Sequence, residues 1–134
     1  MTTKEYLRQA VRLDTIVDLR LAQLERLKSY RERVTTNFTP TPKSGKGGDR
    51  ISEITIKIWS LEETINKDID ELVDLKADIR SRIAEVQDER FRMVLEYKYL
   101  AGYTWDDIAE AMHMDRRWIL RLHGRALQEI NFDH

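Results

Sequence analysis

Arginine is concentrated in one short segment near the end of the chain. Positions 115 to 129 hold four arginines and two acidic residues, a local charge of +2 in a chain whose formal net charge is −1. Arginine suits phosphate contacts and the paired hydrogen bonds that read guanine in the DNA major groove. The segment therefore predicts contact with nucleic acid, and a solvated basic surface is the alternative. The four residues are Arg116, Arg117, Arg121 and Arg125.

A helical wheel, with about 100° per residue, gives this segment two different sides. The apolar side predicts packing on a core and contains Ile119, Leu122, Ala126 and Ile130. The opposite side contains Arg117, Arg121, Gly124 and Gln128, with Arg116 and Arg125 toward its flanks. A glycine inside a helix costs about 1 kcal/mol against alanine. Gly124 therefore predicts close approach by another group, either a DNA backbone or a neighbouring helix.

The residues around this segment have the spacing of a helix-turn-helix, a unit of about twenty residues. A helix over 88–101 begins at Asp88, and Gly102 suits the left-handed position that ends a helix. Thr104 opens a capping box and a short helix over 105–112. His113-Met114 forms the turn, and Asp115 caps a third helix that runs to about residue 130. The apolar residues expected to hold the unit together are Ile108, Ala109, Met112, Met114, Ile119 and Leu122.

Two long helices are predicted before this unit. Residues 3 to about 35 lack glycine and proline, and their apolar seam is Leu7, Ala10, Leu13, Val17, Leu24, Leu27 and Val34. Residues 49–86 are more regular, and their seam is Ile51, Ile54, Ile58, Leu61, Ile65, Ile69, Leu72, Leu75, Ile79, Ile83 and Val86. Steps of three and four residues mark the buried side of a helix.

A loop is predicted between the two long helices. Residues 36–48 contain both prolines and three of the five glycines, and Asp49 or Ser52 could cap the helix that follows. Two helices of similar length joined in this way favour an antiparallel, coiled-coil-like hairpin. Ile56 and Trp59 lie off its seam, where they could widen the apolar side or contact a partner chain. We expect the hairpin to support self-association, with a dimer as the expected state.

Composition excludes several classes of function. The chain has no cysteine, so disulfides, thiolate zinc sites, thiol nucleophiles and iron–sulfur clusters are excluded. Its three histidines form no i, i+4 pair, and no GxSxG elbow is present. We therefore expect no enzyme activity, no metal and no cofactor. Apolar runs of only a few residues and an N-terminus without an apolar core predict no membrane contact and a cytoplasmic location.

The segment LEYKYLAGYTWDDIAEAMHMDRRWILRLHGRALQEI resembles the C-terminal promoter-recognition domain, region four, of bacterial sigma factors. The chain outside 36–48 more closely resembles small phage-encoded RinA/ArpU-like regulators of Gram-positive bacteria. The resemblance is carried by Leu61-Glu62-Glu63, Ile65, Ile69-Asp70, Leu72 and the run from Arg121 to Leu127. It implies activation of late phage genes in the cytoplasm of a bacterial host cell. His113 departs from the pattern, because this turn often has glycine at a position that needs positive φ.

These observations predict an all-α fold, with a long antiparallel helical hairpin in 1–87 and a tri-helical helix-turn-helix domain in 88–134. We expect sequence-specific binding of double-stranded DNA in transcription control. Arg116, Arg117 and Arg121 are expected to meet bases. Arg125 and Lys98 are expected to hold phosphates. Gln128 shares the basic face, and Trp118 is either a core residue or a DNA contact.

Two other functions remain open at this stage. A small-terminase-like DNA-packaging subunit also joins a helix-turn-helix to oligomerising helices, and ring-shaped assemblies would favour it. A module that binds host RNA polymerase would retain that binding after loss of the arginines at 116–125. The sequence alone is compatible with each of these functions.

Overall fold

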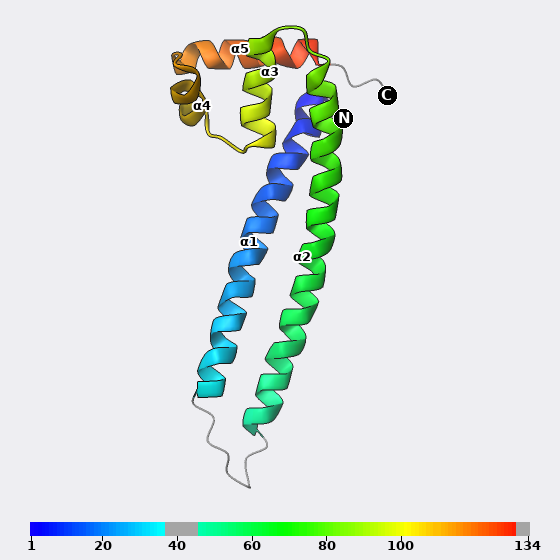
Figure 1. Cartoon of the computed structure of the whole chain (residues 1–134), viewed down its shortest axis with the longest axis vertical. Coiled ribbons are helices and arrows are strands. Elements are labelled where there is room, and N and C mark those ends of the chain that lie inside the picture. Colours follow the sequence, from blue (N-terminus) through cyan, green and yellow to red (C-terminus); the bar gives the residue numbers. More distant parts are fainter. Residues whose placement is uncertain (37–45, 131–134) are drawn as a thin grey trace. The chain divides into compact units, whose positions relative to one another are not determined.

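The computed structural model describes residues 1–36 and 46–130, and every regular element in these ranges is a helix (Figure 1). The predicted all-α class is confirmed. The elements are α1 (Thr3–Thr36), α2 (Lys46–Ala84), α3 (Glu89–Leu95), the π-helix η1 (Glu96–Leu100), α4 (Trp105–Met112) and α5 (Arg116–Glu129). Within the described ranges, no helix combines the length and the apolar composition needed to cross a membrane.

The chain forms two compact units. The first joins residues 1–14 to the chain from Glu71 onward, and the second contains residues 15–70. This division crosses the boundary at residue 87 that the sequence pattern suggests. The first turns of α1 and the last turns of α2 belong with the short helices, although each long helix is continuous in secondary structure.

In the second unit, α1 and α2 pack antiparallel along their apolar seams. Arg20 of α1 lies opposite Asp68 of α2, with 3.0 Å between Nε and Oδ2. Farther along α1, Val34 lines the same hollow as Asp49 near the start of α2. Arg20 interrupts the apolar seam. Its Nε and Asp68 Oδ2 are shielded from solvent, and they form an ion pair without the geometry of a hydrogen bond. The buried apolar residues of this seam in the second unit are Val17, Leu24, Ile58 and Ile65, and the last three form one cluster.

In the first unit, α3, α4 and α5 form a tri-helical core around four buried side chains. These are Val94, Ile108, Ile119 and Leu122. Half-buried side chains packed against them include Phe91, Trp105, Ala109, Met112, Met114 and Trp118. Every apolar position expected to hold the helix-turn-helix together is therefore in or against this core, and that prediction is confirmed.

The second long helix begins earlier than predicted. It starts at Lys46, so Asp49 lies in its first turn and Ser52 lies inside the helix; the prediction that either residue caps it is wrong. Two glycines near the start weaken a helix without forbidding it, and an acidic residue in the first turn favours the helix dipole. Of the loop predicted over 36–48, residues 37–45 lie outside the described residues.

The helix predicted over 88–101 is interrupted. Asp88 caps its start as expected, accepting a 2.9 Å hydrogen bond from the Arg90 backbone N–H. After Leu95 the winding changes to the π-helix η1, in which the Ala101 N–H donates to the Glu96 carbonyl, five residues earlier. The extra residue in the turn changes the register of the side chains that follow, and Tyr99 is buried.

Tyr99 of η1 and His123 of α5 form a buried polar pair. The Tyr99 hydroxyl lies 2.5 Å from His123 Nε2, and the Trp105 and His123 rings form a T-shaped pair with 4.7 Å between centroids. Burial raises the pKa of Tyr99 to about 12. Burial, followed by the charges of Lys4, Lys98 and Arg8, lowers the pKa of His123 to about 4. The imidazole is therefore neutral at neutral pH.

Two turns in the first unit require left-handed backbone. Gly102 has φ of 73°, and His113, at the turn of the helix-turn-helix, has φ of 54°. The Met114 N–H donates to the Ala109 carbonyl and the His113 N–H to the Glu110 carbonyl, which is the Schellman arrangement. Histidine tolerates this region better than most residues but less well than glycine. The tight turn is therefore formed at some conformational cost.

We expect opposite effects from exchanging residues at these two turns. His113→Gly should raise the free energy of unfolding by up to about 1 kcal/mol, because it relieves the left-handed strain. Gly102→Ala should lower it by about 1 kcal/mol, and this loss is purely conformational because no atom lies within 4 Å of the added Cβ. Urea unfolding of the two variants measures both. Shifts of the same sign would contradict the backbone assignment.

The buried imidazole predicts a specific acid instability. Between pH 6.5 and about 4, His123 is protonated in the unfolded chain and neutral in the folded chain. Stability should therefore fall by up to about 1.4 kcal/mol per pH unit as pH decreases through this window. Urea unfolding at pH 7 and pH 5 measures the loss. His123→Gln should flatten this dependence, and a slope in His123→Gln equal to that of wild type would refute the assignment.

Candidate nucleic-acid interface

The helix-turn-helix frame is fixed at both ends of α4. Thr104 and Asp107 form the predicted capping box: the Asp107 N–H donates to Thr104 Oγ1 at 3.1 Å, and the Thr104 N–H donates to Asp107 Oδ2 at 3.3 Å. At the other end, His113 turns the chain into α5. The short turn and the shared core hold α5 against α3 and α4, so one side of α5 is buried and the other is exposed.

The exposed side of α5 carries the predicted basic face. Arg117, Arg121, Arg125 and Gln128 are all exposed. Arg116 is exposed as well, and its Nε lies 3.6 Å from Asp106 Oδ1 of α4, the one ion pair that an α5 arginine makes within residues 1–36 and 46–130. Arg117, Arg121 and Arg125 have no acidic partner in that part of the chain.

The charge at the start of α5 is unfavourable for the helix itself. The first turn contains Arg116 and Arg117 and no acidic residue, and Asp115 occupies the N-cap without a side-chain hydrogen bond. The positive end of a helix dipole disfavours cations. Helix stability therefore does not explain the two arginines, and contact with an external anion would.

Gly124 has open space around it. A Cβ added there would meet no atom within 4 Å, and the residue is exposed in the middle of α5. Packing against a neighbouring helix of the described chain therefore does not account for this glycine.

Two further predicted site residues lie elsewhere. Trp118 is half-buried and packs against the tri-helical core. Lys98 of η1 is half-buried, and its Nζ lies 4.5 Å from the centroid of the Trp105 ring. Burial, followed by the charge of Arg8, lowers the pKa of Lys98. Its environment is thus set by Trp105 and α1, and the structure does not bring it into the row of α5 arginines.

A cavity of about 710 Å³ in the first unit contains Lys98 and was not predicted from the sequence. Its cations are Lys4, Arg8, Arg12 and Lys98, and its wall includes Tyr99, Trp105, Leu120 and His123. The spacing of four residues among Lys4, Arg8 and Arg12 is the signal for it in the sequence, but the same segment also carries the apolar seam of α1.

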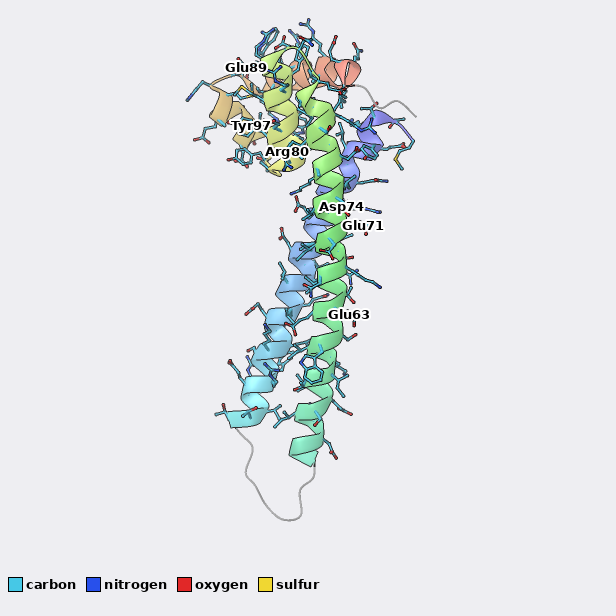
Figure 2. All side chains as sticks on the ribbon, turned by 45° about the vertical axis from the view of Figure 1, so that its right-hand side comes forward. Glu63, Glu71, Asp74, Arg80, Glu89 and Tyr97 are labelled. Atoms are coloured by element: carbon cyan, nitrogen blue, oxygen red, sulfur yellow. The ribbon has the colours of Figure 1, made fainter. Side chains whose placement is uncertain are left out.

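A second hollow, of about 500 Å³, lies beside η1. Figure 2 labels two of its lining residues, Arg80 of α2 and Tyr97 of η1. The Tyr97 ring stacks on Tyr103 at 4.9 Å between centroids. One cation and one carboxylate, Glu96, line this hollow, so it lacks the net positive charge of the cavity at Lys98. In the described ranges, no group of three or more histidine and acidic residues is arranged to hold a metal ion.

Comparison with known proteins places the chain in a family. No curated protein and no solved structure matches the chain. One family model matches residues 42–131, a range that includes all the short helices and the whole of α2. Since this range is more than half of the sequence, the chain belongs to the family described as "Protein of unknown function (DUF1492)".

Proposed function

We propose that the protein binds double-stranded DNA in a sequence-specific way and regulates transcription, with α5 in the major groove. The observation that carries this proposal is the exposed face of α5, where Arg117, Arg121 and Arg125 have no acidic partner in the described chain. A helix-turn-helix presents its second helix to base edges in this way. Arginines without internal partners are free to exchange water for base and phosphate contacts.

Each residue of the face has an expected role. Arg117 and Arg121 project opposite the buried Ile119 and Leu122 and are expected to contact base edges. Arg116 is also expected to contact base edges. Its 3.6 Å ion pair with Asp106 is between exposed side chains and is therefore weak. Arg125 is expected to bind phosphate.

Gln128 and Trp118 have roles that differ from those of the arginines. Gln128 lies nearer the end of α5, where its amide could read adenine. Trp118 packs against the core, so its contribution is to the position of the helix.

The regulatory role rests on the likeness to RinA/ArpU-like proteins together with the family. DUF1492 is often found in phage proteins, which agrees with activation of late phage genes. DNA packaging and polymerase binding are the competing outcomes. Ring-shaped assemblies would favour packaging. Polymerase binding that survives loss of Arg117 and Arg121 would favour the polymerase module.

Self-association is part of this proposal. Ile56 and Trp59 of α2 are 61% and 64% exposed, so they do not widen the packed side of the hairpin within the described second unit. Large exposed apolar side chains close together favour contact with another surface. A dimer would also add affinity by engaging two half-sites.

Removing the base-reading arginines should abolish selective DNA binding. Arg117→Ala and Arg121→Ala should each cost about 1–3 kcal/mol at the selected sequence and relax the preference at one base pair. Helicity should not change, because both side chains are exposed. Binding isotherms on selected and scrambled duplexes, over a salt series, measure this. If wild type prefers no sequence, the proposed function fails; if the variants bind as wild type does, the roles of these residues fail.

Two other substitutions on α5 provide controls for that experiment. Arg125→Ala should weaken binding to every duplex and flatten the salt dependence, since a phosphate contact carries little sequence information. Gly124→Leu meets no neighbour in the described chain and should raise the melting temperature. The same variant should bind DNA poorly because its side chain occupies the space of the approaching backbone. Unchanged DNA binding by Gly124→Leu would contradict this explanation of the glycine.

The exposed apolar pair predicts an oligomer. Wild type should be larger than a monomer at micromolar concentration, and Ile56→Ser with Trp59→Ser should shift it toward monomer without loss of helicity. Sedimentation equilibrium, with and without DNA, measures the state. Val73→Ser, an exposed apolar residue of α2 in the first unit, is the matched control. A wild-type monomer under both conditions would refute self-association.

A further inference from the structure

A row of cations follows the first three turns of α1. Lys4, Arg8 and Arg12 are spaced by four residues, which places them one above another on a helix. All three are exposed, and all three line the 710 Å³ cavity that also contains Lys98. The whole cavity lies within the first compact unit.

This cluster of cations is poorly compensated inside the chain. The one carboxylate in the cavity wall belongs to Glu5. Glu5 is already engaged at the start of α1, where its Oε2 accepts from the Thr2 N–H at 3.1 Å and its own N–H donates to Thr2 Oγ1 at 3.2 Å. Lys98 has no ion pair in the part of the chain that the structure describes. Four positive charges therefore share one carboxylate that also caps a helix.

Lys98 is the most informative member of the cluster. Its ammonium lies 4.5 Å from the centroid of Trp105, and both burial and Arg8 lower its pKa. The neutral His123 beside it adds no charge of its own. A half-buried ammonium facing other cations is unfavourable unless an anion occupies the space between them. The cavity thus has the composition of an anion site with an aromatic floor.

The cavity directly adjoins the basic face of α5. Leu120 and His123 of α5 line it, and Leu120 follows Arg117 by three residues, a rotation of roughly 60° around the helix. A helix in the major groove has a phosphate backbone along each of its flanks. A duplex held by Arg117 and Arg121 would therefore bring one backbone to this flank.

We propose that the cavity is a phosphate site of the DNA interface, in which Lys4, Arg8, Arg12 and Lys98 hold the backbone beside the groove that α5 reads. This inference rests on the proposed function and extends the interface to α1. It also gives Lys98, which stands apart from the α5 arginines, a specific place in DNA binding. Phosphate is the shared chemistry, and the experiment separates a DNA backbone from a free phosphate compound.

The test is the salt dependence of DNA binding by Arg8→Ala with Arg12→Ala in the full chain. Each lost phosphate contact should reduce the slope of log affinity against log salt by about 0.9. The double variant should therefore lose roughly 2 units of slope, equally on selected and scrambled duplexes, and keep its sequence preference. Lys57→Ala with Lys67→Ala removes the same charge from exposed positions of the second unit and should leave the slope unchanged.

A second measurement locates the contact on the DNA. Single phosphates of the selected duplex are replaced by uncharged methylphosphonates. A replacement outside the base pairs read by α5 should weaken DNA binding by wild type and leave DNA binding by the Arg8, Arg12 double variant unchanged. If the loss of affinity from the replacement adds to the loss from the double variant, the proposal is overturned.

The remaining outcomes distinguish a failure of the cavity assignment from a failure of the proposed function. Selective wild-type binding with an unchanged slope in the double variant would overturn the cavity assignment and leave the proposed function standing. Loss of wild-type selectivity would overturn the proposed function and the assignment with it. A last outcome would identify a site for a free phosphate compound and overturn the DNA assignment. In that case pyrophosphate raises the melting temperature of wild type but not of Arg8→Ala, and Arg8→Ala binds DNA as wild type does.

Discussion

The hydrogen bond between Tyr99 and His123 is the interaction on which the candidate interface depends. It is 2.5 Å long and buried, and it joins η1 to α5 while Trp105 of α4 contacts the same imidazole. Separating two buried polar groups leaves each without a partner, at a cost of about 1–3 kcal/mol per group. This cost favours one arrangement of the helices. The residue before Tyr99 is Lys98, so the same contact also fixes where that ammonium enters the cavity.

A second polar contact holds η1 at the residue after Tyr99. Lys76 of α2 donates to the Leu100 carbonyl at 3.1 Å and lies 2.7 Å from Asp14 Oδ2 of α1. The carbonyl groups at the end of a helix lack partners within it, and here a lysine from another helix supplies one. Arg92 has a comparable role at the preceding turn, where it donates to the carbonyls of Val86 and Gln87 at 2.6 and 2.9 Å. Lys76 and Arg92 thus satisfy backbone oxygens, whereas the α5 arginines make no such contact within residues 1–36 and 46–130.

Much of the fold could be predicted because its signals are local. The bounds of α1, α4 and α5 follow from glycine, proline and capping residues, and Thr104 and Gly102 behave as their types require. The π-turn could not be predicted, because Glu96–Leu100 contains ordinary helix-forming residues, and the wider winding that accompanies the burial of Tyr99 leaves no local signal in them. Of the candidate site, the basic face of α5 follows from one helix wheel. The cavity does not, because it joins residues about ninety positions apart.

The helix-turn-helix is not a compact unit by itself. Leu7 and Ala10 of α1 and Ile79 and Ile83 of α2 are fully buried, and all four belong to the unit that contains α3–α5. Full burial of a leucine or isoleucine side chain contributes about 1.5–3 kcal/mol. The three short helices alone would expose these partners and lose that contribution. Since the family match begins at residue 42 and leaves α1 out, the shared sequence is not the whole of the packing unit, and α1 completes both the core and the cationic cavity.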